Sequence, residues 1–114
     1  MEKKFFSLCS SSGNTFLFKV AAKLTSTSIK EAAKKEDADI FFSDLKSPGT
    51  IFEENFENLN EKPAIILSTQ DDYYNKKIYN YLKELGIEKN KIILKIPSSN
   101  ITEEIKEIIT KLLS

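Results

Sequence analysis

Three residues of different chemical type follow apolar runs of the sequence or lie within one, and together they could accept a phosphoryl group. Asp44 and Ser68 each follow an apolar run, and Lys95 lies inside a third one. A carboxylate can act as a nucleophile and form an acyl phosphate. A hydroxyl can then bond a phosphoryl oxygen, and an ammonium group can neutralise its charge. These residue types therefore predict a phosphoryl-acceptor site, provided that the fold brings them together.

The elements that would position these residues alternate along the whole chain, which is typical of repeated strand–helix units. The runs expected to form strands are Phe5–Leu8, Leu24–Thr27, Ile40–Phe42, Ala64–Leu67 and Ile92–Ile96. Helical spacing is expected in five apolar groups: Leu17, Val20, Ala21 and Leu24; Ile29, Ala32 and Ala33; Phe52, Phe56 and Leu59; Ile78, Tyr81, Leu82 and Leu85; and Ile101, Ile105, Ile108, Ile109 and Leu112.

Local signals mark where several of these helices should begin or end. Ser28 with Glu31, and Asn100 with Glu103, have the spacing of capping boxes and predict helix starts. Gly86 is expected to end the helix before it. If Phe16–Lys35 were instead one broken helix, the second strand would be lost and the sheet would have four strands.

Five strands and five helices with short links predict a single α/β domain over residues 1–114. Right-handed crossovers give a doubly wound, five-stranded parallel sheet of order 2-1-3-4-5, a flavodoxin-like three-layer sandwich. Ligands of such sheets bind beyond the carboxyl ends of the strands. We therefore expect Asp44, Ser68, Lys95 and the hydroxyl-rich segment Ser10–Thr15 to meet at one edge.

Composition excludes several function classes. The sequence has no histidine, so His-based acid–base catalysis and most zinc sites are excluded. Its 17 basic residues are all lysine and balance 17 acidic ones, which argues against a nucleic-acid partner or a membrane-surface partner. No apolar run approaches the roughly 20 residues of a membrane span. One cysteine, Cys9, and no recognisable signal peptide predict a cytoplasmic protein.

The order of these segments resembles the receiver domains of response regulators. The segments that match are Thr25–Ala32, Asp39–Gly49, Pro63–Ser68 and Leu94–Pro97. The second segment is the most specific, because an acceptor Asp (here Asp44) followed four residues later by Pro48 is typical of that family. The resemblance implies Asp44, Ser68 and Lys95 as phosphorylation-site residues of a bacterial-type phosphorelay. It also implies a protein partner, a histidine kinase or a downstream protein, and a signalling or binding domain rather than an enzyme.

The sequence departs from the receiver pattern at the metal site. Receivers hold a divalent ion with an acidic pair after the first strand, where this sequence has Cys9 and Ser10. The resemblance implies Mg²⁺ bound with Asp44 as a ligand, but the missing acidic pair fits a degenerate receiver that works by protein contact alone. The switch aromatic of the fifth strand is also replaced, by Ile92.

A second resemblance is to flavodoxins, small electron carriers that bind FMN. Their phosphate loop wraps the FMN phosphate with hydroxyls and backbone amides at a helix start, as the segment containing Ser10, Ser12, Gly13, Asn14 and Thr15 could do. Two aromatic residues after the fourth strand would then flank the flavin ring; these are Tyr73 and Tyr74.

Two further alternatives use the same architecture. Cys9, placed after the first strand and before a hydroxyl-rich loop, looks like the phosphocysteine of sugar phosphotransferase IIB components, with its thiolate activated by a helix N-terminus. The stretch from Ile65 to Ile87 also looks like Rossmann-type domains of nucleotide-sugar enzymes, although the glycine fingerprint of such domains is absent from the first strand.

A purely structural role is the alternative for each candidate. Asp44 could cap a strand–loop junction, Ser68 could satisfy a strand end, and Lys95 could lie at the sheet edge with its ammonium in water. Cys9 could be a small buried apolar residue. The four tyrosines of the chain could form a half-exposed helix surface that suits a protein interface; they are Tyr73, Tyr74, Tyr79 and Tyr81.

Overall fold

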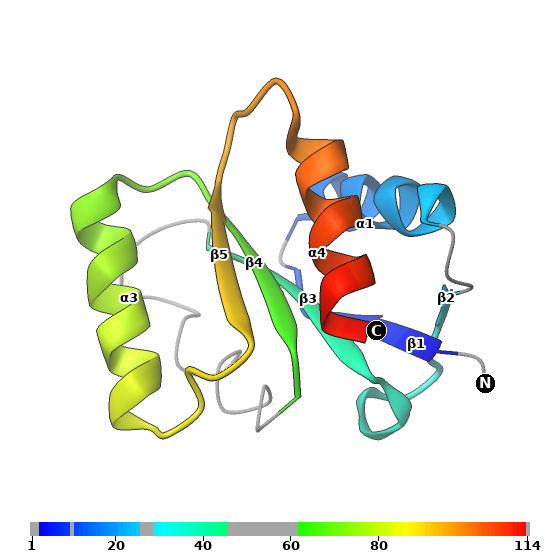
Figure 1. The fold of residues 1–114 in the computed structure, drawn as a ribbon, viewed down its shortest axis with the longest axis horizontal. Helices are drawn as coiled ribbons and strands as arrows, with labels where there is room; N and C mark the ends of the chain where they lie inside the picture. Colours follow the sequence, from blue (N-terminus) through cyan, green and yellow to red (C-terminus); the bar gives the residue numbers. More distant parts are fainter. Residues whose placement is uncertain (1–2, 10, 26–28, 46–61, 114) are drawn as a thin grey trace.

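A five-stranded parallel sheet forms the centre of the protein (Figure 1). The computed structural model describes residues 3–9, 11–25, 29–45 and 62–113. The strands are β1 (Lys3–Ser7), β2 (Ile29–Glu31), β3 (Ile40–Leu45), β4 (Ala64–Ser68) and β5 (Lys91–Lys95). Their order is β2-β1-β3-β4-β5 and every pairing is parallel, so the predicted topology is confirmed.

Helices cover both faces of the sheet, which makes three layers. The described helices are α1 (Ser12–Leu24), α3 (Asp72–Glu84), α4 (Ile101–Leu113) and a short 3₁₀ helix η1 (Lys35–Asp37). In Figure 1, α1 and α4 lie together on one side and α3 lies on the other. No described helix is long and apolar enough to cross a bilayer.

The core divides into two parts because side chains alternate between the faces of a strand. On β3, Ile40 and Phe42 pack with α1 and α4, whereas Phe41 packs with α3. The Phe42 ring stacks on Phe5 and Phe18, with centroids 4.8 and 4.3 Å away. All five of these side chains are at least 95 % buried, so they hold β3 in the centre of the sheet.

Two helices have side-chain caps, and one of them ends at a glycine as predicted. Ser11 caps α1 by accepting a hydrogen bond from the backbone of Asn14, and Asp71 caps α3 by accepting one from Tyr74. Gly86 follows α3 with φ of 73°, a left-handed conformation that a glycine adopts without strain. These caps fix where each helix begins and ends relative to the strand before or after it.

The second strand lies later in the chain than predicted. The sequence placed it at Leu24–Thr27, but Leu24 ends α1 and the strand is Ile29–Glu31. A helix starting after Ser28 was predicted there and is wrong. The stretch pairs in parallel with Lys3–Phe5, and the Ala32 amide donates to the Phe5 carbonyl. Pairing with β1 therefore overrides the local capping-box signal.

The remaining differences concern ends of elements and the middle of the chain. β3 continues beyond Phe42 to Leu45, so Asp44 belongs to the strand rather than to the loop after it. The four-stranded alternative is wrong, because β2 pairs with β1. The helix predicted from Phe52, Phe56 and Leu59, and the break at Pro48-Gly49, lie outside the described residues.

Candidate functional site

The Asp44 carboxylate lies at the beginning of α1. Asp44 is the second-last residue of β3, and it is only 4 % exposed. Its Oδ2 accepts hydrogen bonds from the Ser11 amide at 3.2 Å and from Asn14 Nδ2 at 2.8 Å. Because α1 has no acidic residue in its own first turn, Asp44 supplies the negative charge that a helix N-terminus favours.

Other polar groups complete a small network around this carboxylate. Ser7 Oγ and Thr15 Oγ1 are hydrogen-bonded at 2.9 Å, and Thr15 Oγ1 also donates to the Ser11 carbonyl at 3.3 Å. The Cys9 amide donates to Ser7 Oγ at 3.3 Å. We call this set the Asp44 cluster; it consists of Ser7, Cys9, Ser11, Asn14, Thr15 and Asp44. The cluster joins the ends of β1 and β3 to the first turn of α1.

Cys9 is held as a protonated thiol by its surroundings. Burial raises the pKa of this thiol to about 12, a hydrogen bond with Ser7 opposes the rise, and the negative charge of Asp44 adds to it. A nucleophilic cysteine needs the thiolate form. The pKa of Cys9 is therefore shifted in the direction opposite to the expected activation, because burial is the largest cause and Asp44 adds to it. The phosphocysteine alternative loses support, and Cys9, which is half-buried against the core on the α1 and α4 side, fits the structural alternative of a small apolar residue better.

Ser68 is buried at the end of β4 and takes part in a different network. Its Oγ donates to Asn75 Oδ1 at 2.6 Å and accepts from the Gln70 amide at 3.1 Å. Asn75 Nδ2 donates to the Gln70 carbonyl at 3.3 Å. Ser68 therefore closes the turn that leads from β4 into α3.

Lys95 ends β5 and pairs with the first residue of α3. Its Nζ lies 3.6 Å from Asp72 Oδ1, and the two side chains are 56 % and 92 % exposed. An ion pair that is open to water holds its two partners weakly. Lys95 is therefore a surface residue on the same side of the sheet as the Ser68 network.

Side-chain alternation separates the three predicted phosphorylation-site residues. Asp44 has the same parity on β3 as Phe42, which packs towards α1 and α4, and its named donors come from the start of α1. Ser68 has the parity of Ile66 on β4, which packs towards α3. In the register, Ser68 pairs with Lys95, whereas Asp44 pairs with Leu67. The sheet thus brings Ser68 and Lys95 together beside α3 and directs Asp44 to the opposite face.

The residues predicted to bind the FMN phosphate are mostly engaged within the Asp44 cluster. Ser10 lies outside the described residues, while Ser12 and Gly13 are exposed in the first turn of α1. Asn14 and Thr15 make the hydrogen bonds given above. The Asp44 carboxylate already accepts a hydrogen bond from the Ser11 amide. A phosphate at this position would therefore be repelled by the negative charge of Asp44. FMN binding stays a prediction, and the described contacts of Asn14 and Thr15 do not favour it.

The two tyrosines predicted to flank a flavin lie on α3. Tyr73 is 70 % exposed, and Lys77 Nζ lies over its ring, 4.6 Å from the ring centroid. Tyr74 is half-buried and packs against the core on the α3 side. The two rings therefore have different surroundings, one open to solvent and one packed against the sheet.

The described part of the Asp44 cluster does not fit Mg²⁺. This ion prefers several oxygen ligands in octahedral geometry. Here Oδ2 of one carboxylate accepts two hydrogen bonds, and the position that is acidic in receivers holds the protonated thiol of Cys9. Within the described residues, no group of three or more histidine, cysteine, aspartate or glutamate side chains could hold a metal ion.

Sequence reasoning missed the residues that engage the candidates. Asn14, predicted to belong to a phosphate loop, donates a hydrogen bond to Asp44. Asn75 was not singled out, although it binds Ser68. A signal for Asn75 existed, since an amide one turn into α3 and seven residues after a strand-ending serine can reach back to it. No local pattern indicates the contact between Asn14 and Asp44, which are 30 residues apart.

The comparisons with known proteins give one kind of likeness. No protein-family model matches the chain, and no curated protein matches it by sequence. Among solved structures, the chain is similar to a response regulator receiver domain protein, CheY-like, from Methanospirillum hungatei JF-1. The TM-score is 0.53 at 12 % identity, and the match covers 97 % of this chain and 99 % of that one. The protein thus has the fold of CheY-like receiver domains over nearly its whole length.

Proposed function

We propose that this chain is a degenerate receiver-like signalling domain that acts through protein contacts, with Asp44 serving as a structural carboxylate. The observation that carries this function is the bonding of Asp44 Oδ2 to the Ser11 amide and to Asn14 Nδ2. A phosphoryl acceptor must present a carboxylate oxygen to the incoming group. In this protein the carboxylate oxygen with two donors joins β3 to α1, and the residue is 96 % buried.

The charges around Asp44 support the same function. Phosphoryl transfer depends on cations that neutralise the transferred group. Lys95 is paired with Asp72 beside α3, and the position after β1 holds the protonated thiol of Cys9 instead of a carboxylate. The residues that assist transfer in receivers are therefore either replaced or directed to the other face.

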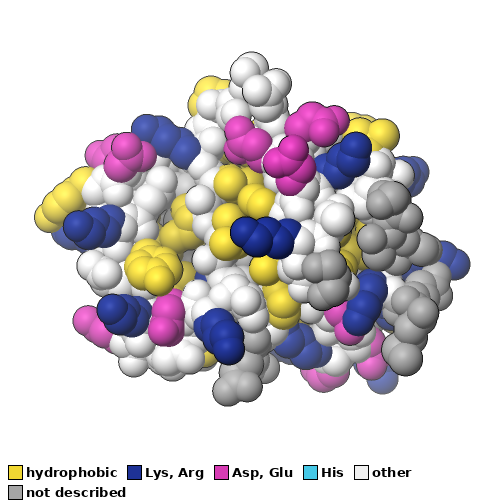
Figure 2. All heavy atoms as spheres, in the orientation of Figure 1, with side chains coloured by type: hydrophobic (Ala, Val, Ile, Leu, Met, Phe, Trp, Pro, Cys, Tyr) yellow, Lys and Arg dark blue, Asp and Glu magenta, His cyan; other side chains and the backbone are white. Residues whose placement is uncertain are grey.

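The surface is compatible with a protein partner. Figure 2 shows lysine and acidic side chains interspersed around apolar patches on one face of the molecule. The whole chain has 17 basic and 17 acidic residues. A mixed surface of this kind suits protein contacts, whereas nucleic acid and anionic membranes attract surfaces with a strong positive field.

The first test is chemical phosphorylation. The protein is incubated with acetyl phosphate and Mg²⁺, and its intact mass is measured beside that of a CheY-like receiver treated in the same way. We expect the receiver to gain a phosphoryl group and this protein to keep its mass. Asp37→Asn, at an exposed position in η1, is the matched control for Asp44→Asn. A phosphoryl adduct that persists in Asp37→Asn and disappears in Asp44→Asn would restore Asp44 as the acceptor, and a histidine kinase as the expected donor.

The second test concerns the contacts themselves. The tagged protein is used to capture partners from an extract of its source organism, with and without acetyl phosphate and Mg²⁺. We expect one set of specific partners that is the same under both conditions. A partner set that changes with the phosphodonor, or the lack of any specific partner in both samples, would contradict a phosphorylation-independent contact domain.

A further inference from the structure

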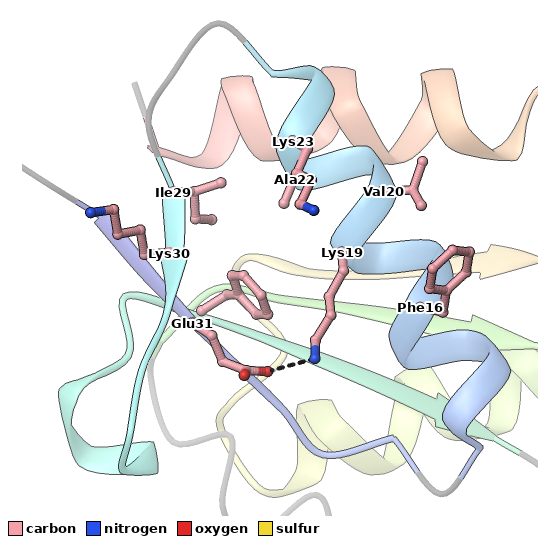
Figure 3. A pocket seen from close by; sticks show the side chains of 9 residues that line it. Phe16, Lys19, Val20, Ala22, Lys23, Ile29, Lys30 and Glu31 are labelled. Atoms are coloured by element: carbon pink, nitrogen blue, oxygen red, sulfur yellow. Dashed lines mark ion pairs between the residues drawn. The ribbon is translucent and has the colours of Figure 1, made fainter.

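A cavity of about 370 Å³ lies between α1 and β2, away from the Asp44 cluster (Figure 3). None of its nine lining residues belongs to that cluster. β2 is the outermost strand on its side of the sheet, so the cavity lies at the sheet edge. Its volume is in the range of ordinary small-molecule sites, about 300–1,000 Å³.

The inner surface of this cavity is apolar. Phe5 is 5 % exposed and belongs to the core, and Ala22 on α1 is similarly buried. Val20 on α1 and Ile29 on β2 are half-buried and also line the cavity. Phe16 stands at one end and is 68 % exposed. When a ligand covers an aromatic side chain that is exposed to water beside an apolar cavity, the free energy of the complex is lowered.

The polar lining is mostly cationic. Lys19, Lys23 and Lys30 line the cavity together with a single acidic residue, Glu31. Lys19 Nζ lies 3.3 Å from Glu31 Oε2, as the dashed line in Figure 3 marks. Lys23 extends from α1 beside Ala22, and Lys30 points away from the helix. Because Glu31 is paired with Lys19 and Lys30 points away from the helix, Lys23 is the cation beside the apolar lining, and it favours a ligand with a negative head group over a neutral or positive one.

From this combination we infer that the cavity binds a small amphipathic carboxylate, with its apolar body over Phe5 and Ile29 and its head group near Lys23. The lysine ammonium is a compact point charge, so it can pair with a single carboxylate without a particular bidentate geometry. Glu31 lowers the affinity of the site for the head group, because its carboxylate repels the head group and forms an ion pair with Lys19. This site is independent of the function proposed for the Asp44 cluster.

The probe for this site is decanoate, used below the concentration at which it forms micelles. Binding is followed by the backbone amide signals of the isotope-labelled protein in NMR. We expect saturable shifts at Phe16, Val20 and Ile29, with a Kd of roughly 0.1–1 mM for a ligand of this size. Decanol should bind about tenfold more weakly, and decyltrimethylammonium more weakly still.

Substitutions separate the apolar contribution from the charged one. Lys23→Glu should weaken decanoate binding about tenfold at low salt, whereas Lys76→Glu, which makes the same charge change on the exposed surface of α3, should leave it unchanged. Glu31→Gln should strengthen decanoate binding several-fold and leave decanol binding unchanged. Phe16→Ala should weaken decanoate and decanol equally, because it removes an apolar wall.

Three outcomes would overturn the assignment. The first is the absence of saturable shifts around α1 and β2 with decanoate. The second is equal affinity for decanoate and decanol, which would leave an apolar cavity without a preference for anions. The third is equal weakening by Lys23→Glu and Lys76→Glu, which would reduce the effect to net charge. Binding of an acidic peptide with aromatic residues, without binding of decanoate, would assign the cavity to a protein partner instead.

Discussion

The two groups of polar residues at the carboxyl ends of the strands are held by different helices. The Asp44 cluster has a buried carboxylate at its centre, which is bonded to the beginning of α1. The second group, which we call the α3-side pairs, consists of Ser68 with Asn75 and Lys95 with Asp72. Both groups lie at the carboxyl ends of the strands, but they lie on opposite faces of the sheet because successive side chains of a strand alternate between its faces. Residues that follow neighbouring strands in sequence can therefore face opposite layers, and a shared edge does not by itself make a shared site.

Breaking the Asp44 cluster should have the largest effect on stability. Asp44→Ala leaves the Ser11 amide and Asn14 Nδ2, which are both partly buried, without their named acceptor. We expect the free energy of unfolding to fall by about 3 kcal/mol. Asp44→Asn keeps an oxygen acceptor and should cost about half as much. Urea denaturation measures both, and equal stability of Asp44→Ala and wild type would show that these bonds contribute nothing.

Breaking a buried α3-side pair should have a moderate effect. Ser68→Ala removes a donor to Asn75 and an acceptor for the Gln70 amide, which we expect to cost about 1–2 kcal/mol in the same urea assay. Combined with Asn75→Ala, the loss should be clearly non-additive. Combined with Asp44→Asn, it should add within about 0.5 kcal/mol, because the two networks lie on opposite faces. Strong coupling to Asp44→Asn would contradict that separation.

Alkaline pH should test the surroundings of Cys9. The folded-state pKa is about 12 and the ordinary value is 9.0, so the unfolded chain loses the thiol proton first. Stability is therefore fully present below pH 9 and is lost as pH rises towards 12. By pH 10 the loss should be roughly 1 kcal/mol.

The control for Cys9 is its own substitution. Lysines and tyrosines also titrate at high pH, so the quantity to compare is the pH dependence of unfolding in wild type and in Cys9→Ala. We expect the variant to lose less stability between pH 8 and pH 10, by about the amount given above. Identical slopes would show that the folded protein does not raise the pKa of this thiol.

The exposed α3-side pair should have the smallest effect. Lys95→Ala removes an ion pair whose side chains are 56 % and 92 % exposed. We expect a change in unfolding free energy within about 0.5 kcal/mol, which should decrease further with added salt. Thermal or urea unfolding at low and high ionic strength measures it. A loss comparable to that of Ser68→Ala would show that Lys95 takes part in a stronger network than the pair with Asp72.

Much of the fold followed from patterns in the sequence. Fully apolar runs such as Ile40–Phe42 and Ala64–Leu67 predicted buried parallel strands, and Gly86 marked the end of α3. The position of β2 did not follow. Three residues carry too little pattern to identify a strand, and the pairing partner that decides their conformation, Lys3–Phe5, lies about 25 residues earlier in the chain.

The candidate site was predicted less well than the fold, for a geometric reason. The sequence shows which residues end strands, and a one-residue difference in where a strand pairs changes the face on which a side chain lies. Asp44 pairs with Leu67 and not with Ser68, so the predicted trio divides. The structural alternative for Asp44, a cap at a strand–loop junction, was also available from sequence, but its donors Ser11 and Asn14 required the tertiary fold.

The outermost strand on the side of the sheet opposite β2 has a consequence for association between molecules. β5 is an outermost strand with the sequence Lys-Ile-Ile-Leu-Lys, an aliphatic run of the kind that adds strands from other chains. If two copies joined there in register, either antiparallel or parallel, Lys95 would lie opposite Lys91 or opposite another Lys95. Like charges that face each other across strands are destabilising. Lys95, whose side chain is 56 % exposed, therefore acts against edge-to-edge aggregation, a role that requires no ligand.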